Sequence, residues 1–221
     1  MTISARNQAR LGTISEVKSL MQSLATLDAI LESSWSARRH HFNSRWGVGM
    51  QLGSMLNGEG DSWFCVFSAM GAVLKGFAHE SEMSPWHSGN NGIWPGVLEE
   101  VPEPLKIVLA DPSLSIEETT FCFWRMQDDS QWHRGRIHYP PGDDPDGSVR
   151  LLRILDGNPN TYKQWAESYF ERTVDLTMVR AIYSRQPLTT EIIRVVNPQR
   201  DLRSLQDDVA EIGYSIDIEN A

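Results

Sequence analysis

Apolar side chains recur every three or four positions near the start of the chain. Those that form the pattern over residues 14–33 are Ile14, Val17, Met21, Leu24, Leu27 and Leu31. This spacing predicts a helix with one apolar face, which we expect to pack against a sheet. Thr13 and Glu16 stand at its start with the spacing of a capping box.

The pattern changes to β-prone, glycine-punctuated runs between residues 46 and 78. The runs "VGMQLGSML", "SWFCVFS" and "AVLKGFA" are separated by short turn sequences, which predicts three strands in an antiparallel meander. Two further runs, "TTFCFWRMQ" and "QWHRGRIHY", flank the polar turn "DDS" and predict a hairpin over residues 119–139. The two units together predict an antiparallel sheet of about five strands.

Helical periodicity returns after residue 148. It is present in "TYKQWAESYFE", "DLTMVRAIYS", "TTEIIRVV" and "LRSLQDDVAEIG". Residues 149–155 form an apolar and basic run that favours a short helix, with a strand as the alternative. Strands that cluster apart from helices indicate the α+β class. We expect one domain over residues 1–221, sheet-rich up to residue 140 and helical over 148–215, with the helices packed on the sheet.

The charge of the chain is strongly negative and unevenly spread. The formal net charge is −9, and residues 51–123 carry ten Asp or Glu against two Lys or Arg. Such a surface repels the phosphate backbone of a nucleic acid, so we do not expect a nucleic-acid partner. It is compatible with a protein partner that has a basic surface. The oligomeric state stays open.

The lack of recognisable targeting signals and the two cysteines in apolar runs lead us to expect a cytoplasmic protein. No run approaches the ~18 apolar residues of a membrane span, and "MTISARNQARLGTISE" lacks the pattern of a secretory signal. Cys65 and Cys122 lie in apolar runs and are expected to be buried thiols in a reducing compartment. A single bridge between them is the alternative.

The stretch "KGFAHESEMSPWHSGNNGIWPG" (75–96) holds the candidate binding residues. His79, Glu80, Glu82 and His87 are of types that bind metals. Their spacing matches no ligand template such as His-Glu-x-x-His, whereas such residues commonly satisfy backbone groups in a loop. We therefore expect no metal and no cofactor.

Two tryptophans stand apart from the rest in the same stretch. Trp86 and Trp94 flank a segment rich in Gly and Asn. Tryptophan is favoured at the centre of protein–protein interfaces, but it also anchors long loops to the body of a protein. The sequence leaves both roles open.

Motifs of nucleophilic catalysis and phosphate binding are missing from the sequence. It contains no Gly-x-Ser-x-Gly elbow, no phosphate-binding loop and no dinucleotide fingerprint. The acids in "GDDPDGS" (142–148) and the residues of "DGNPN" (156–160) are typical of tight turns rather than of a calcium site. These observations lean away from an enzyme.

Several segments together resemble a bacterial family of hypothetical cytosolic proteins. They are "KGFAHESEMSPW", "WPGVLEEVPE", "TTFCFWR", "PGDDPDGS", "ILDGNPNTYKQWAESYFER" and "PLTTEIIRVVNPQRDL", and the resemblance covers about residues 35–215. The family implies no catalytic residue. In type, a small acidic cytosolic α+β protein is similar to the immunity proteins of bacterial toxin systems.

Three functional hypotheses follow from the sequence. The leading one is a non-enzymatic protein that binds another protein, as an immunity or regulatory partner. The alternative is a hydrolase or small-molecule binding protein, with His79, Glu80 and His87 beside a pocket near the 76–96 loop. The third is a structural homodimer that uses a sheet edge or the first helix.

Overall fold

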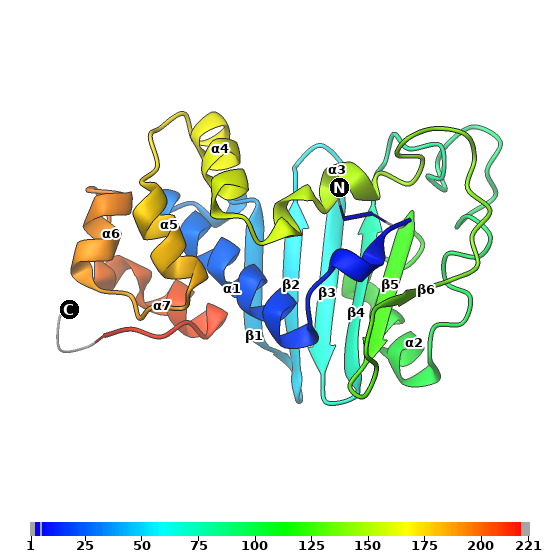
Figure 1. Ribbon diagram of the computed structural model, residues 1–221, viewed down its shortest axis with the longest axis horizontal. Helices are drawn as coiled ribbons and strands as arrows, with labels where there is room; N and C mark the ends of the chain where they lie inside the picture. The colour runs from blue at the N-terminus through cyan, green and yellow to red at the C-terminus, as the bar shows by residue number, and fades with distance from the viewer. Residues whose placement is uncertain (1–2, 5, 218–221) are drawn as a thin grey trace.

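A six-stranded antiparallel sheet forms the centre of the protein (Figure 1). The computed structural model describes residues 3–4 and 6–217. The N-terminal stretch in which we expect no secretory signal therefore begins outside the described residues. Each strand pairs with the next one in the chain, which confirms the α+β class and the antiparallel sheet. The strands are β1 (His40–Gly47), β2 (Met50–Leu56), β3 (Ser62–Ser68), β4 (Gly71–Phe77), β5 (Phe121–Met126) and β6 (His133–Arg134).

The first strand, β1, is absent from the sequence prediction, which therefore has one strand too few. Its sequence, "HHFNSRWG", lacks an apolar run, because β1 lies at the edge of the sheet and buries only part of its side chains. It is held in register with β2 by pairs such as Phe42 with Gly53. The predicted hairpin over 119–139 does form, but its second strand, β6, has only two residues.

The helices lie on both sides of the sheet. Helix α1 packs against β1 and β2, and α7 packs against both α1 and β1. None of the helices in the described ranges is long and apolar enough to cross a bilayer. The helices are α1 (Ile14–Leu31), α2 (Glu103–Leu109), α3 (Ser148–Leu151), α4 (Pro159–Tyr169), α5 (Leu176–Tyr183), α6 (Thr190–Val196) and α7 (Leu202–Ile212).

Two details of the predicted helices are settled. The capping box of Thr13 and Glu16 is present at the start of α1. Residues 149–155 are helical, because α3 is followed by a 3-10 turn at Arg153–Asp156.

Separate apolar cores lie on the two faces of the sheet. The first core joins the sheet to α1 and to the C-terminal helices. The second joins it to α2 and the segment around it. Cys65 belongs to the first core and Cys122 to the second. Both are free thiols, and their positions on opposite faces exclude a bridge between them.

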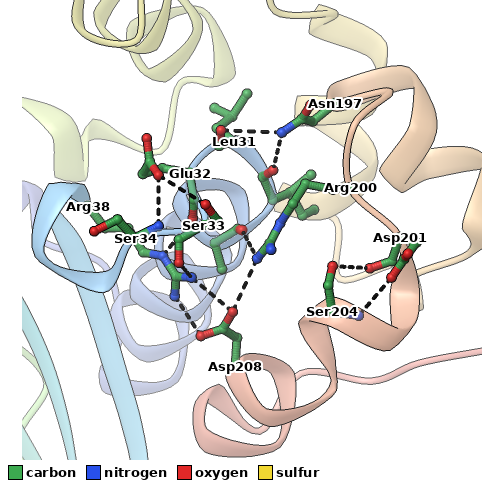
Figure 2. Close-up of polar contacts among 12 residues, drawn as sticks. Leu31, Glu32, Ser33, Ser34, Arg38, Asn197, Arg200, Asp201, Ser204 and Asp208 are labelled. Carbon is green, nitrogen blue, oxygen red and sulfur yellow. Dashed lines mark hydrogen bonds and ion pairs between the residues drawn. The ribbon is translucent and has the colours of Figure 1, made fainter.

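Side chains from distant parts of the chain close the C-terminal end of α1 (Figure 2). Asn197 Nδ2 donates to the carbonyl oxygen of Ile30 at 2.8 Å, and Arg200 Nη2 donates to the preceding carbonyl oxygen at 2.9 Å. Cationic donors stabilise the negative end of a helix. Asp208 of α7 then binds Arg38 at 2.6 Å and Arg200 at 3.4 Å. This network fixes the segment that leads into β1.

Candidate functional site

A groove of about 1160 Å³ opens beside the start of β1. Its walls come from the segment that leads into β1, the end of β2, the α3 region and α4, with two residues from the N-terminal segment. The polar and charged residues that line it are Arg10, Arg39, His40, Asn57, Glu59, Asp144, Arg150, Arg153, Asp156, Thr161, Gln164 and Ser168.

The arginines give the groove a positive character in an otherwise acidic protein. Arg39 and Arg153 line it, and neither forms an ion pair with a residue in the described part of the chain. The acids of the groove are partly engaged by their own loops. Asp144 accepts two backbone N–H groups at 2.9 and 3.0 Å, and Asp156 accepts the hydroxyl of Thr161 at 2.6 Å. Neither Asp144 nor Asp156 is therefore paired with Arg39 or Arg153 in the described structure.

The half-buried Arg39 is held in place by an aromatic ring. Its guanidinium carbon lies 4.6 Å from the centre of the Tyr169 ring. Its Nε is buried and has no hydrogen-bond partner in the described structure. A buried donor without an acceptor is costly, so Arg39 carries an unsatisfied group in the wall of the groove.

A buried carboxylate, Asp28 of α1, sits behind the groove. Its Oδ2 accepts the backbone N–H groups of Arg39 and His40 at 3.1 and 2.9 Å, and contacts Nδ1 of His40 at 3.1 Å. Its Oδ1 accepts the hydroxyl of Tyr162 at 2.7 Å. Burial, followed by the charge of Asp28, raises the pKa of Tyr162 well above its ordinary value. Asp28 thus ties α1, β1 and α4 together.

His40 belongs both to this buried cluster and to the wall of the groove. Because a carboxylate oxygen accepts, the contact with Asp28 places a proton on Nδ1. Nε2 makes no hydrogen bond to any residue that the structure describes, and His40 is among the residues that line the groove. Trp165 of α4 packs edge-on against it at 4.7 Å between ring centres. The ring is therefore fixed with one uncommitted nitrogen.

The predicted site residue His79 does not line the groove, but it is connected through Asp61 to Arg150, which does. Its backbone N–H and its Nδ1 both contact Oδ1 of Asp61 at 3.0 Å, and Oδ2 of Asp61 binds Arg150 at 2.6 Å. Burial acts to raise the pKa of Asp61, but the hydrogen bonds from Arg150 and His79 outweigh it and lower that pKa. His79 thereby supports the wall of the groove without lining it.

The other predicted ligand residues do not form one cluster. Glu80 is exposed, and its carboxylate lies 3.8 Å from Nε2 of His79. Glu82 and His87 are exposed elsewhere in the loop. Within residues 3–4 and 6–217, no group of three or more His, Cys, Asp or Glu could hold a metal ion. None of the four residues lines the groove.

The two tryptophans of the 76–96 loop have different environments. Trp94 is half-buried against the second core, and its Nε1 donates to the carbonyl oxygen of His138 at 3.0 Å. Close by, Gly96 has φ +91°, and a Cβ there would lie 2.1 Å from the carbonyl oxygen of Arg136. Trp94 is therefore an anchor of the loop. Trp86, in contrast, is 65% exposed.

The sequence interpretation missed the pair of Asp28 and His40, although a signal was present. Asp28 lies four residues after Leu24 and three before Leu31, on the apolar face of the predicted helix. A carboxylate on such a face must find buried partners. The position of Asp28 could therefore have indicated a buried polar cluster, although it does not identify the partners of the carboxylate.

The fold and the groove define an α+β protein with an arginine-lined cavity. Comparisons with family models, with curated proteins and with solved structures found no match for the chain.

Proposed function

We propose that the protein binds a small organic anion in the groove. The observation that carries the proposal is the pair of arginines, Arg39 and Arg153, that line the groove without an ion pair. Guanidinium groups bind carboxylate and phosphate oxygens with directional, charge-assisted hydrogen bonds. A cavity of about 1160 Å³ is large enough for an organic molecule, since small-molecule sites measure roughly 300–1,000 Å³.

The rest of the lining supports an organic ligand rather than a bare ion. Trp165, Met55 and Ile154 give the groove apolar surface beside the charged groups. Aromatic and apolar walls with a few polar groups are typical of small-molecule sites. The proposed site differs from the one expected near the 76–96 loop. Asp61 lies between the two, because it binds His79 with one oxygen and the groove residue Arg150 with the other.

A titration with glucose 6-phosphate, with glucose as the uncharged control, tests the proposal. We expect the melting temperature to rise with the logarithm of the phosphate ester concentration once this exceeds the dissociation constant. Changing Arg39→Gln and Arg153→Gln should each weaken binding by about tenfold or more, because each removes a charge-assisted hydrogen bond. Calorimetric titration measures both constants.

The matched control is Arg194→Gln, because Arg194 is exposed on α6 and does not line the groove. This variant should bind like the wild type. Equal affinities for glucose 6-phosphate in all three variants would contradict the proposal, since binding would then not depend on the groove.

A second candidate function is binding to another protein, as an immunity or regulatory partner with a basic surface. Trp86 supports it, because a tryptophan that is 65% exposed on an acidic surface is suited to an interface. Capture of a partner from native lysate should be lost with Trp86→Ala and kept with Trp35→Ala, whose side chain is 56% exposed. A partner that binds both variants equally would exclude a role for Trp86.

A further inference from the structure

We infer that an oxyanion binds the groove together with one proton, which is taken up by Nε2 of His40. The inference rests on the proposed function and adds a substrate class to it, namely ligands with a phosphate, sulfate or carboxylate group. The proton comes from a hydronium ion or a buffer acid, whose bond to that proton breaks as the N–H bond forms on His40. It returns to the solvent when the anion leaves.

The geometry fixes which nitrogen takes the proton. Nδ1 and the backbone N–H of His40 both point to the same oxygen of Asp28, at 3.1 and 2.9 Å. The other oxygen of Asp28 is occupied by Tyr162 at 2.7 Å. His40 is only 4% exposed, so its ring cannot turn freely to offer Nδ1 to a ligand. Nε2 is therefore the ring nitrogen without a hydrogen-bond partner in the described structure.

A neutral His40 would meet an anion with the lone pair of Nε2, and the two would repel each other. Protonation turns Nε2 into a donor and places the imidazolium between the carboxylate of Asp28 and the bound oxyanion. Charge-assisted hydrogen bonds of this kind are the stronger ones in proteins. The anion should therefore draw a proton onto the ring.

Negative groups near the ring favour the protonated form. Asp28 of α1 is in direct contact with it. From α7, Asp208 and Glu211 line a small cavity beside the ring, and Asp208 is already paired with Arg38. Tyr162 of α4 stays neutral, because burial raises its pKa well above its ordinary value. Asp28 is thus the main counterion.

Positive groups near the ring oppose protonation until the anion arrives. Arg39 and, across the groove, Arg153 share the cavity with His40. Burial lowers the pKa of the neighbouring His41 to about 4, so His41 is neutral near pH 7. The strands behind the ring present Met55 and Trp63. An oxyanion beside Arg39 would cancel the repulsion and couple binding to proton uptake.

Sulfate is the probe of choice, because its own charge does not change near neutral pH. Calorimetric titrations in two buffers with different ionisation heats report the number of protons taken up. We expect close to one proton to be taken up per sulfate above neutral pH, because the bound anion draws a proton onto Nε2. The affinity should then fall by about tenfold for each further pH unit.

His40→Asn should abolish this pH dependence. The amide of Asn can still donate to Asp28, as Nδ1 does, but it has no counterpart of Nε2. His138→Asn is the control, because His138 is exposed and does not line the groove, and it should keep the wild-type slope. The buffer comparison on the wild type needs no variant, so the inference can be tested even if His40→Asn does not fold.

Two results would overturn the inference. Sulfate that binds the groove with the same affinity from pH 6 to 9, and without proton uptake, would refute the role of His40 but leave the proposed function standing. No sulfate binding at any pH, together with no binding of glucose 6-phosphate, would refute both.

Discussion

Replacing Asp28 with alanine should lower the free energy of unfolding by about 3–5 kcal/mol, because several buried donors are left without an acceptor at about 1–3 kcal/mol each. The carboxylate is fully buried and accepts four hydrogen bonds from two chain segments. Without it, Tyr162 and the N–H groups at the start of β1 lose their acceptor in the core. The loss should appear as a lower urea midpoint with an unchanged slope.

Asp28→Asn should cost less, about 1–2 kcal/mol, because the amide oxygen can keep the N–H donors of Arg39 and His40. The hydroxyl of Tyr162 can turn to accept from the amide nitrogen. Asp207→Ala is the control, since Asp207 is exposed on α7 and should change the stability very little. If Asp28→Ala unfolded at the same urea concentration as this control, Asp28 would not join α1, β1 and α4.

Asp146→Asn is expected to stabilise the protein at neutral pH and to lose that advantage in acid. Asp146 is 2% exposed at the entrance to α3. One oxygen accepts from the N–H and the hydroxyl of Ser148 at 3.0 and 2.7 Å, but the other is buried without a partner in the described structure. Burial raises the pKa of Asp146 to about 6.

The sign follows from the protons bound in each state. The pKa of Asp146 is 3.8 in an ordinary environment and about 6 in the fold, so between these values this carboxyl holds more protons in the folded protein than in the unfolded chain. The contribution of Asp146 to the stability of the wild type therefore falls as the pH rises through this window. His41, with its pKa lowered to about 4, has the opposite effect, but it is present in both proteins and cancels in their difference.

The advantage of Asp146→Asn should thus grow by about 2 kcal/mol from roughly pH 4.5 to roughly pH 7.5, as the shift of the pKa implies. Urea unfolding at both pH values measures it. The control is Asp143→Asn in the same loop, where the side chain is exposed and the difference should not depend on pH. A constant difference between Asp146→Asn and the wild type would mean that the carboxylate is not destabilised by burial.

Elements with a strong apolar pattern could be predicted from the sequence. The apolar residues of α1, β3 and β5 indicate by themselves that these elements are buried. Their side chains enter the two cores. β1 could not be predicted in this way. It lies at the edge, and its residues are placed by pairing with β2 and by contacts with α1 and α7. Such long-range partners leave no local pattern.

The groove was hidden for a related reason. Its residues come from segments spread over most of the chain. Arg150 and Arg153 are close together in the sequence, but Arg10 and Arg39 are far from them. The 75–96 stretch attracted attention because its polar residues are close in sequence. In the fold, His79 only supports the groove through Asp61, and Trp94 is an anchor. Local density of reactive residue types was therefore a poor guide to the cavity.

Anion binding in the groove can be tested most directly by soaking crystals of the protein in tungstate, a tetrahedral oxyanion with strong anomalous scattering. We expect an anomalous peak within hydrogen-bonding distance of the guanidinium of Arg39 and Nε2 of His40. It should disappear in crystals of Arg39→Gln. A groove without tungstate, in crystals where the ion occupies other surface sites, would contradict the proposal that this cavity is an anion-binding site.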